Sequence, residues 1–188
     1  GDIAIFHSGK SPIKWNRQGM FIVDGSNPIY EWKEYIPFEH RPHVINPTKG
    51  YLSSANQNPV DEKYPYYLSE YFAPSYRATQ INIMLDTLYK ATISDMKNIQ
   101  LDNTYLIAKY TLPKLLSLIK IETSNNNIEY WISILKKWNY QYDGELVAPT
   151  FFDSWIKKIE EYTWGINLSN DTIQYIWPDI NKLEELIT

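Results

Sequence analysis

Prolines crowd the first 75 residues of this chain, where eight of its 11 prolines lie. A proline has no backbone N–H to donate, and it biases the residue before it toward extended geometry. A long helix therefore does not fit between prolines that are so closely spaced, and short strands joined by ordered loops are expected. The pattern of apolar residues predicts these strands at residues 2–8, 20–23 and 50–55.

The spacing of apolar residues changes to that of a helix from Arg77 onward. Thr92, followed by Asp95 three positions later, is typical of a capping box that opens a short helix. Four residues follow the i, i+3, i+4, i+7 pattern of one helix face, namely Ile81, Met84, Leu85 and Leu88. Further helices are predicted at residues 103–121, 128–138, 150–162 and 172–187, with a polar break at 124–127.

These patterns predict an α+β chain that is mostly helical from about residue 77 onward. A strand-and-loop segment at residues 1–75 and a helical segment at 76–188 are expected to form one compact unit. The 188 residues suffice for a core, and 44% hydrophobic with 21% charged residues is typical of a folded domain.

The charge balance argues against two classes of partner. Lys and Arg number 18 against 22 Asp and Glu, which gives a net charge of −4, and no long basic run occurs. Nucleic acid and anionic membrane surfaces are therefore not expected partners. The most apolar stretch, residues 105–121, is interrupted by three lysines, so no membrane span is predicted. The chain has no cysteine, which excludes a disulfide or a thiol nucleophile within it.

Aromatic residues are unusually frequent, at 15% of the chain. They suit a core, an interface or a pocket equally well. One alternative is therefore a non-catalytic binding module whose Trp and Tyr side chains line a groove for glycan or peptide. Another is a helical scaffold for partner proteins, because Trp131-Ile132 and Trp155-Ile156 are each followed by a Lys-Lys pair. A pattern that occurs only twice does not make a solenoid, which needs at least three repeats.

Two histidines near an acidic residue raise the question of a metal site. His40 and His43 lie close to Glu39, but Pro42 forces an extended path between them and His7 is distant in the sequence. Zinc sites need three or four convergent ligands. We interpret these histidines as loop residues bonded to the backbone, and the sequence assigns no metal ligands, so the metal ligands of this chain stay unknown at this point.

A cluster of amides follows the predicted strand at residues 50–55. Asn56, Gln57 and Asn58 precede Pro59, which marks a turn. Such amides can cap a turn, or they can point their NH₂ groups at a developing oxyanion. The residue types alone leave both interpretations open, with the turn cap the simpler one.

Short motifs before and after these amides form a recognisable series. They are Pro42-His43-Val44-Ile45-Asn46-Pro47, Gly50-Tyr51, Ala55-Asn56, Tyr64-Pro65 and Tyr76-Arg77-Ala78. In order and spacing the series resembles the β-chain of penicillin acylases, the N-terminal-nucleophile amidohydrolases also called the penicillin amidase family. The resemblance implies that the strands belong to a four-layer αββα sandwich.

The resemblance also implies roles for two residues. Asn56 matches the asparagine that supplies the side-chain half of the oxyanion hole. Arg77 matches the arginine that organises the site near the nucleophile's α-amino group and the maturation of the enzyme by self-processing. Because Arg77 opens a predicted helix, its charge needs an offsetting partner. A structural arginine would meet a carboxylate such as Glu70 or Asp61, whereas a functional one would point toward Asn56.

The family attacks its substrate with a serine at the start of the β-chain, whose own α-amino group is the general base. This chain begins at Gly1, so we expect an interior segment of the β-chain that is inactive alone. The parent enzyme would hydrolyse small acyl amides through an acyl-enzyme, with the α-chain and the remaining β-chain as partners. No cofactor is expected in this segment. The resemblance is compatible with calcium in the parent and with export to the periplasm or the cell exterior.

Overall fold

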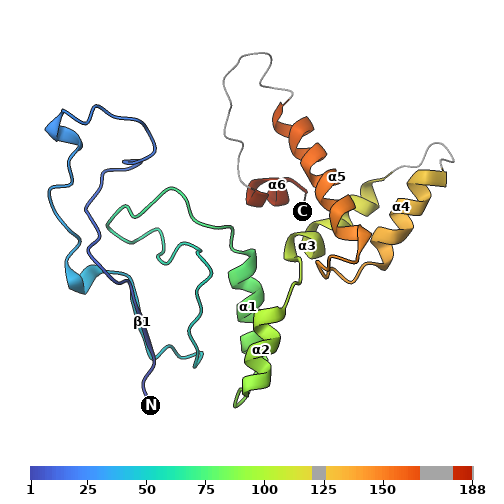
Figure 1. Ribbon diagram of the computed structural model, residues 1–188, viewed down its shortest axis with the longest axis horizontal. Coiled ribbons are helices and arrows are strands. Elements are labelled where there is room, and N and C mark those ends of the chain that lie inside the picture. Colours follow the sequence, from blue (N-terminus) through green and yellow to red (C-terminus); the bar gives the residue numbers. More distant parts are fainter. Residues whose placement is uncertain (120–125, 166–179, 188) are drawn as a thin grey trace. The chain divides into compact units, whose positions relative to one another are not determined.

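The computed structural model describes residues 1–119, 126–165 and 180–187 (Figure 1). The chain forms two compact units, Gly1–Leu88 and Tyr89–Thr188. The first unit holds a two-stranded sheet and one α-helix, and the described part of the second unit is helical. The predicted α+β character is confirmed.

The sheet of the first unit is short and antiparallel. β1 (Ala4–Phe6) pairs with β2 (His43–Ile45), with Phe6 opposite His43. The rings of this last pair stack at 5.1 Å between centroids. All six strand residues are exposed. Two strands with both faces exposed are marginal on their own, so the sheet offers apolar surface that a larger structure could cover.

The predicted strand at residues 2–8 is confirmed in its central part only. The prediction at 20–23 is wrong, because this segment is not part of a strand. It follows two tight turns, which are closed by hydrogen bonds from Gln18 N to Trp15 O and from Met20 N to Arg17 O. The prediction at 50–55 is also wrong, since this segment pairs with no strand in the part of the chain that the structure describes.

The rest of the first unit consists of turns, two 3₁₀-helices and α1. The 3₁₀-helices are η1 (Pro28–Tyr30) and η2 (Phe38–His40), each preceded or opened by proline as expected for a helix start. α1 (Tyr76–Asp86) confirms the predicted change to helical structure. Its Ala78 is 5% exposed and anchors the start of the helix in the unit.

The second unit begins with α2 (Ile93–Leu101), whose capping box is formed by Thr92 and Asp95 as predicted. The remaining helices follow the predicted periodicity with shifted ends. They are α3 (Leu106–Leu118), α4 (Asn126–Lys137), α5 (Val147–Trp164) and α6 (Ile180–Ile187). α3 packs on α6, and α4 packs on α5. The predicted break at 124–127 and helix at 172–187 lie partly outside the described residues.

The core of the second unit centres on α3 and α5. Phe152 of α5 is fully buried, and the ring of Tyr105 meets it edge-on at 5.8 Å. The Tyr105 hydroxyl donates to Asp153 Oδ1 at 2.8 Å, and the Tyr142 hydroxyl donates to the other oxygen of that carboxylate. This carboxylate therefore ties the start of α3 and the loop before α5 to one helix. No described helix is both long and apolar enough to cross a membrane.

Candidate functional site

The backbone turns sharply at both ends of the segment from residue 50 to residue 56. Gly50 N donates to Pro47 O at 2.9 Å, and Gly50 has a φ of +76°, a left-handed value that favours glycine. Asn56 has a φ of +66°, which asparagine tolerates better than most residues. Its carbonyl oxygen accepts a hydrogen bond from Ala73 N at 2.8 Å. Asn56 is therefore held at a defined corner of the chain.

Arg77, the second residue of α1, contacts this corner. One of its nitrogens, Nη2, donates to Ala55 O at 3.1 Å and to Asn56 Oδ1 at 3.0 Å. A guanidinium group only donates hydrogen bonds, so the amide of Asn56 must turn its oxygen toward Arg77. Nδ2, with its two N–H groups, then points elsewhere, and it has no acceptor among the described residues.

The two candidate carboxylate partners of Arg77 lie elsewhere. No carboxylate of the described residues lies within 4.0 Å of the Arg77 guanidinium. Glu70 instead approaches Arg17, at 3.9 Å from Nε to Oε1. The structure thus brings Arg77 together with Asn56, while it leaves the catalytic roles of the two residues as predictions.

Asn56 lines a groove of about 590 Å³ in the first unit. The groove is bounded by residues from four segments, at 5–7, 42–44, 53–59 and 71–73. The wall formed by β1 and β2 carries the stacked rings of Phe6 and His43, and Phe72 contributes a further ring. Asn56, Gln57 and Asn58 line the groove as well, so it combines an aromatic wall with amide groups.

The groove carries no fixed ionic charge from the part of the chain that the structure describes, since its lining includes no Asp, Glu, Lys or Arg. Its titratable imidazoles are His7 and His43. His43 Nδ1 lies 2.7 Å from Arg41 O, and because a carbonyl oxygen only accepts, Nδ1 donates this hydrogen bond. His7 Nε2 lies 3.1 Å from the hydroxyl of Ser11, a residue that is buried. A site with amide donors and no carboxylate suits an oxygen that gains negative charge during a reaction.

The histidines considered as metal ligands have other contacts. His43 bonds to the backbone, as interpreted from the sequence, whereas His40 Nδ1 lies 2.7 Å from the hydroxyl of Tyr66. In the ranges 1–119, 126–165 and 180–187, no three acidic or histidine side chains are grouped so that they could hold a metal ion.

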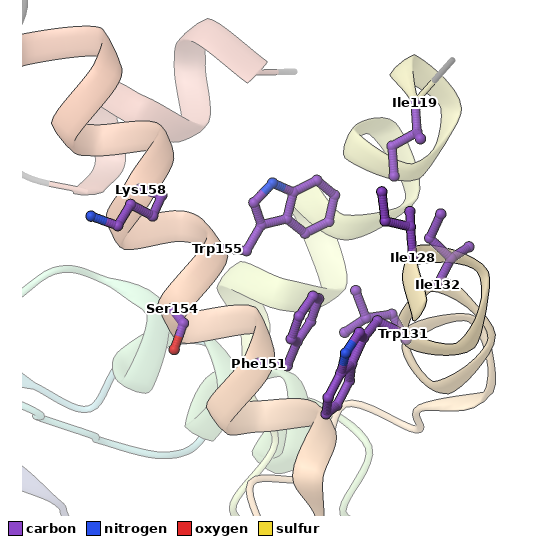
Figure 2. Close-up of a pocket in the computed structure, with 9 residues that line it drawn as sticks. Ile119, Ile128, Trp131, Ile132, Phe151, Ser154, Trp155 and Lys158 are labelled. Atoms are coloured by element: carbon purple, nitrogen blue, oxygen red, sulfur yellow. The ribbon is translucent and has the colours of Figure 1, made fainter. Parts of the chain in front are cut away.

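A second hollow, of about 530 Å³, lies between α4 and α5 in the second unit (Figure 2). Trp131 and Phe151 stack face to face there at 4.6 Å, and Trp155 lies beside them. Ser154 and Lys158 extend from α5 away from the isoleucines of the opposite wall. The rest of the lining is apolar, while the Ser154 hydroxyl donates to Thr150 O and Lys158 pairs with Glu161, so this hollow presents no cluster of polar groups for chemistry. The groove beside Asn56 is therefore the candidate site.

Sequence reasoning missed the residues that hold the segment before Asn56. The Ser53 hydroxyl donates to Asn82 Oδ1, and the Tyr51 hydroxyl donates to Asp86 Oδ1, both at 2.6 Å. The bond to Asp86 is also the main reason why the pKa of Tyr51 is raised. Two patterns in the sequence could have indicated these contacts. Tyr51 and Ser53 are alternate residues of an extended segment, and their partners Asn82 and Asp86 are polar residues four apart on a helix face.

Comparisons with known proteins find similarity along the whole chain. The family model described as Penicillin amidase matches residues 1–188. Penicillin acylase 2 proenzyme from Pseudomonas sp. (strain SE83) is 33% identical over 81 residues, which is 43% of this chain and 10% of that protein. Penicillin G acylase from Escherichia coli is 25% identical over 175 residues, which is 84% of this chain and 20% of that protein. The chain thus spans a fifth or less of the length of these curated relatives.

Proposed function

Because this chain belongs to the penicillin amidase family, we propose that it forms part of an amidohydrolase that cleaves linear amide bonds through an acyl-enzyme. The nucleophile in this proposal is a serine outside residues 1–188. The chain contributes a hydrogen-bond donor and the surface around it. The observation that carries the proposal is the pairing of Arg77 with Asn56 beside the groove.

The proposed role of Asn56 is to stabilise the oxyanion. When a hydroxyl attacks an amide carbonyl, the carbonyl oxygen gains negative charge in the tetrahedral intermediate. Nδ2 of Asn56 would donate to that oxygen together with a backbone N–H from another part of the enzyme. Arg77 supports this role, because it engages Oδ1 and so leaves the N–H groups of the amide for the substrate. An amide that could flip would also present its oxygen, an acceptor, to the substrate.

The proposed role of Arg77 is to organise the site without touching the substrate. Its hydrogen bonds to Ala55 O and Asn56 Oδ1 fix both the backbone and the side chain at the corner. A positive charge close to the amide also polarises its N–H bonds, which strengthens their donation to an anion.

The exposed apolar surface supports a place within a larger enzyme. Exposed aromatic side chains occur in both units, among them Phe21 and Trp32 in the first and Tyr89 and Tyr162 in the second. A binding module would gather such residues in one patch. Both faces of the β1–β2 sheet are exposed as well, as expected of strands that continue into the proposed αββα sandwich. These features favour the amidase over the binding module.

The proposal is tested by trapping the acyl-enzyme. The complete enzyme is incubated with a serine-directed acylating probe and digested, and the labelled peptide is identified by mass spectrometry. We expect one labelled serine, outside residues 1–188, and loss of amide hydrolysis with labelling. Stoichiometric labelling of a serine within this chain would show that a different nucleophile operates. The 188-residue chain alone is the control, and it should neither be labelled nor release product from an amide reporter.

A further inference from the structure

Three hydrogen bonds join alternate residues of the segment before Asn56 to residues of α1. They are Tyr51 to Asp86 at 2.6 Å, Ser53 to Asn82 at 2.6 Å and Arg77 to Ala55 at 3.1 Å. The order is reversed between the two partners, so the segment runs antiparallel to the helix. The side chains of Tyr51 and Ser53 both reach α1, as alternate residues of an extended chain do, and this explains why the segment has the pattern of a strand.

The repeat distances of the two partners match. Two residues of extended chain advance by about 6.6 Å, and four or five residues of an α-helix advance by about 6 to 7.5 Å. The segment and α1 therefore advance by about the same distance between successive contacts. Contacts with a helix can in this way fix the position of an irregular segment along the helix axis.

From this register we infer that Ser53 and Asn82 are a positioning pair for the amide of Asn56, an inference that rests on the proposed oxyanion role. The Ser53 to Asn82 bond is the middle one of the three contacts and the one between side chains that lies nearest to the corner in the sequence. Arg77 sets the orientation of the Asn56 amide, and Asn82 sets the position, along the axis of α1, of the backbone that carries this amide. Ser53 also lines the groove, so a shift of its backbone moves the wall of the site.

The inference predicts a particular kinetic effect. Asn82→Ala removes the acceptor of the Ser53 hydroxyl, and it does not weaken α1, because alanine is a better helix former than asparagine. A misplacement of about 1 Å at a reacting centre can cost up to about 100-fold in rate. We expect kcat to fall by roughly 10- to 100-fold with KM nearly unchanged, since the oxyanion forms only in the transition state.

The test measures kcat, KM and melting temperature in the complete enzyme. Ser53→Ala should reproduce the effect of Asn82→Ala, and the double variant should be no worse than either, because both remove the same bond. Asn82→Asp keeps an acceptor for the hydroxyl and should restore most of kcat. Gln80→Ala, about 200° away around the helix, is the matched control and should behave as the unchanged enzyme.

Two outcomes separate this inference from the proposed function. Normal turnover in both Asn82→Ala and Ser53→Ala, with Asn56→Ala impaired, would overturn the positioning role and leave the oxyanion role standing. Normal turnover in Asn56→Ala would remove the oxyanion role and this inference with it. A fall in kcat that Asn82→Asp does not restore would also overturn the inference, because it would show that the hydrogen bond to Ser53 is not the cause.

Discussion

Arg77 Nη2 lies 3.0 Å from Asn56 Oδ1 and donates a hydrogen bond to it. Arg77 is the second residue of α1, where the partial positive charge of the helix end disfavours a cation by a few tenths to about 1 kcal/mol. The bonds to Asn56 and to the carbonyl of Ala55 offset this cost. The cation of Arg77 thus lies at an unfavourable position, where it orients the amide of Asn56. We expect this relationship of a residue that belongs to the candidate site.

Asn56→Ala in the complete enzyme should lower kcat by about 10²- to 10³-fold with little change in KM, because it removes an oxyanion donor. A turn cap at this position would instead predict a loss of about 1 kcal/mol in stability and nearly normal turnover. Steady-state kinetics and thermal melting distinguish the two. Asn58→Ala is the matched control, since Asn58 also lines the groove but Arg77 does not contact it. Full activity in Asn56→Ala would refute the assignment.

Arg77→Lys should impair turnover or self-processing while the fold stays intact. Lysine keeps the charge, but it lacks the planar group whose Nη2 reaches both Ala55 O and Asn56 Oδ1. The amide of Asn56 would then be free to flip. Activity, the extent of chain processing and the circular dichroism spectrum are measured together. Lys114→Arg, an exposed change on α3, serves as the control; a fully processed and fully active Arg77→Lys enzyme would mark Arg77 as structural.

The sequence predicts best where local signals and the final contacts agree. The capping box of Thr92 and Asp95 is complete within four residues, and the apolar spacing that identifies α1 is likewise local. β2 was missed because this strand, which lies between Pro42 and Pro47, has only three residues, too few for a periodic pattern. Residues 50–55 were misassigned because an extended segment has the same alternation whether its partner is a strand or a helix.

The candidate site divides in the same way. Asn56 and Arg77 were identified through a resemblance between motifs, and their mutual contact required the folded chain. The pairing of Ser53 with Asn82 spans 29 positions, and neither residue is unusual in its local sequence. The alternation of Tyr51 and Ser53 marks residues that could make such contacts, but the identity of their partners depends on the register between the segment and the helix.

Phe152→Ala should destabilise the second unit by about 3 to 5 kcal/mol, because Phe152 is fully buried and the removal of a buried ring leaves a cavity. The adjacent Phe151 is only half-buried and stacks on Trp131, so Phe151→Ala is the matched control and should cost less. Urea denaturation of the 188-residue chain, followed by tryptophan fluorescence, measures both. Equal losses would mean that the burial of Phe152 does not dominate the core.

The second unit should lose stability above about pH 10 through Tyr105. Burial first, and then the hydrogen bond to Asp153, raises the pKa of the Tyr105 hydroxyl far above its usual value. The folded state therefore holds the proton more tightly than the unfolded state, whose tyrosine titrates near pH 10. The stabilisation is complete below that pH and decreases as the pH rises above it. Tyr105→Phe should flatten the dependence of the unfolding free energy on pH between about pH 9 and 11, measured by urea denaturation. Tyr162→Phe, which removes an exposed hydroxyl from α5, is the control. An unchanged slope in Tyr105→Phe would show that this hydroxyl is not what couples the fold to alkaline pH.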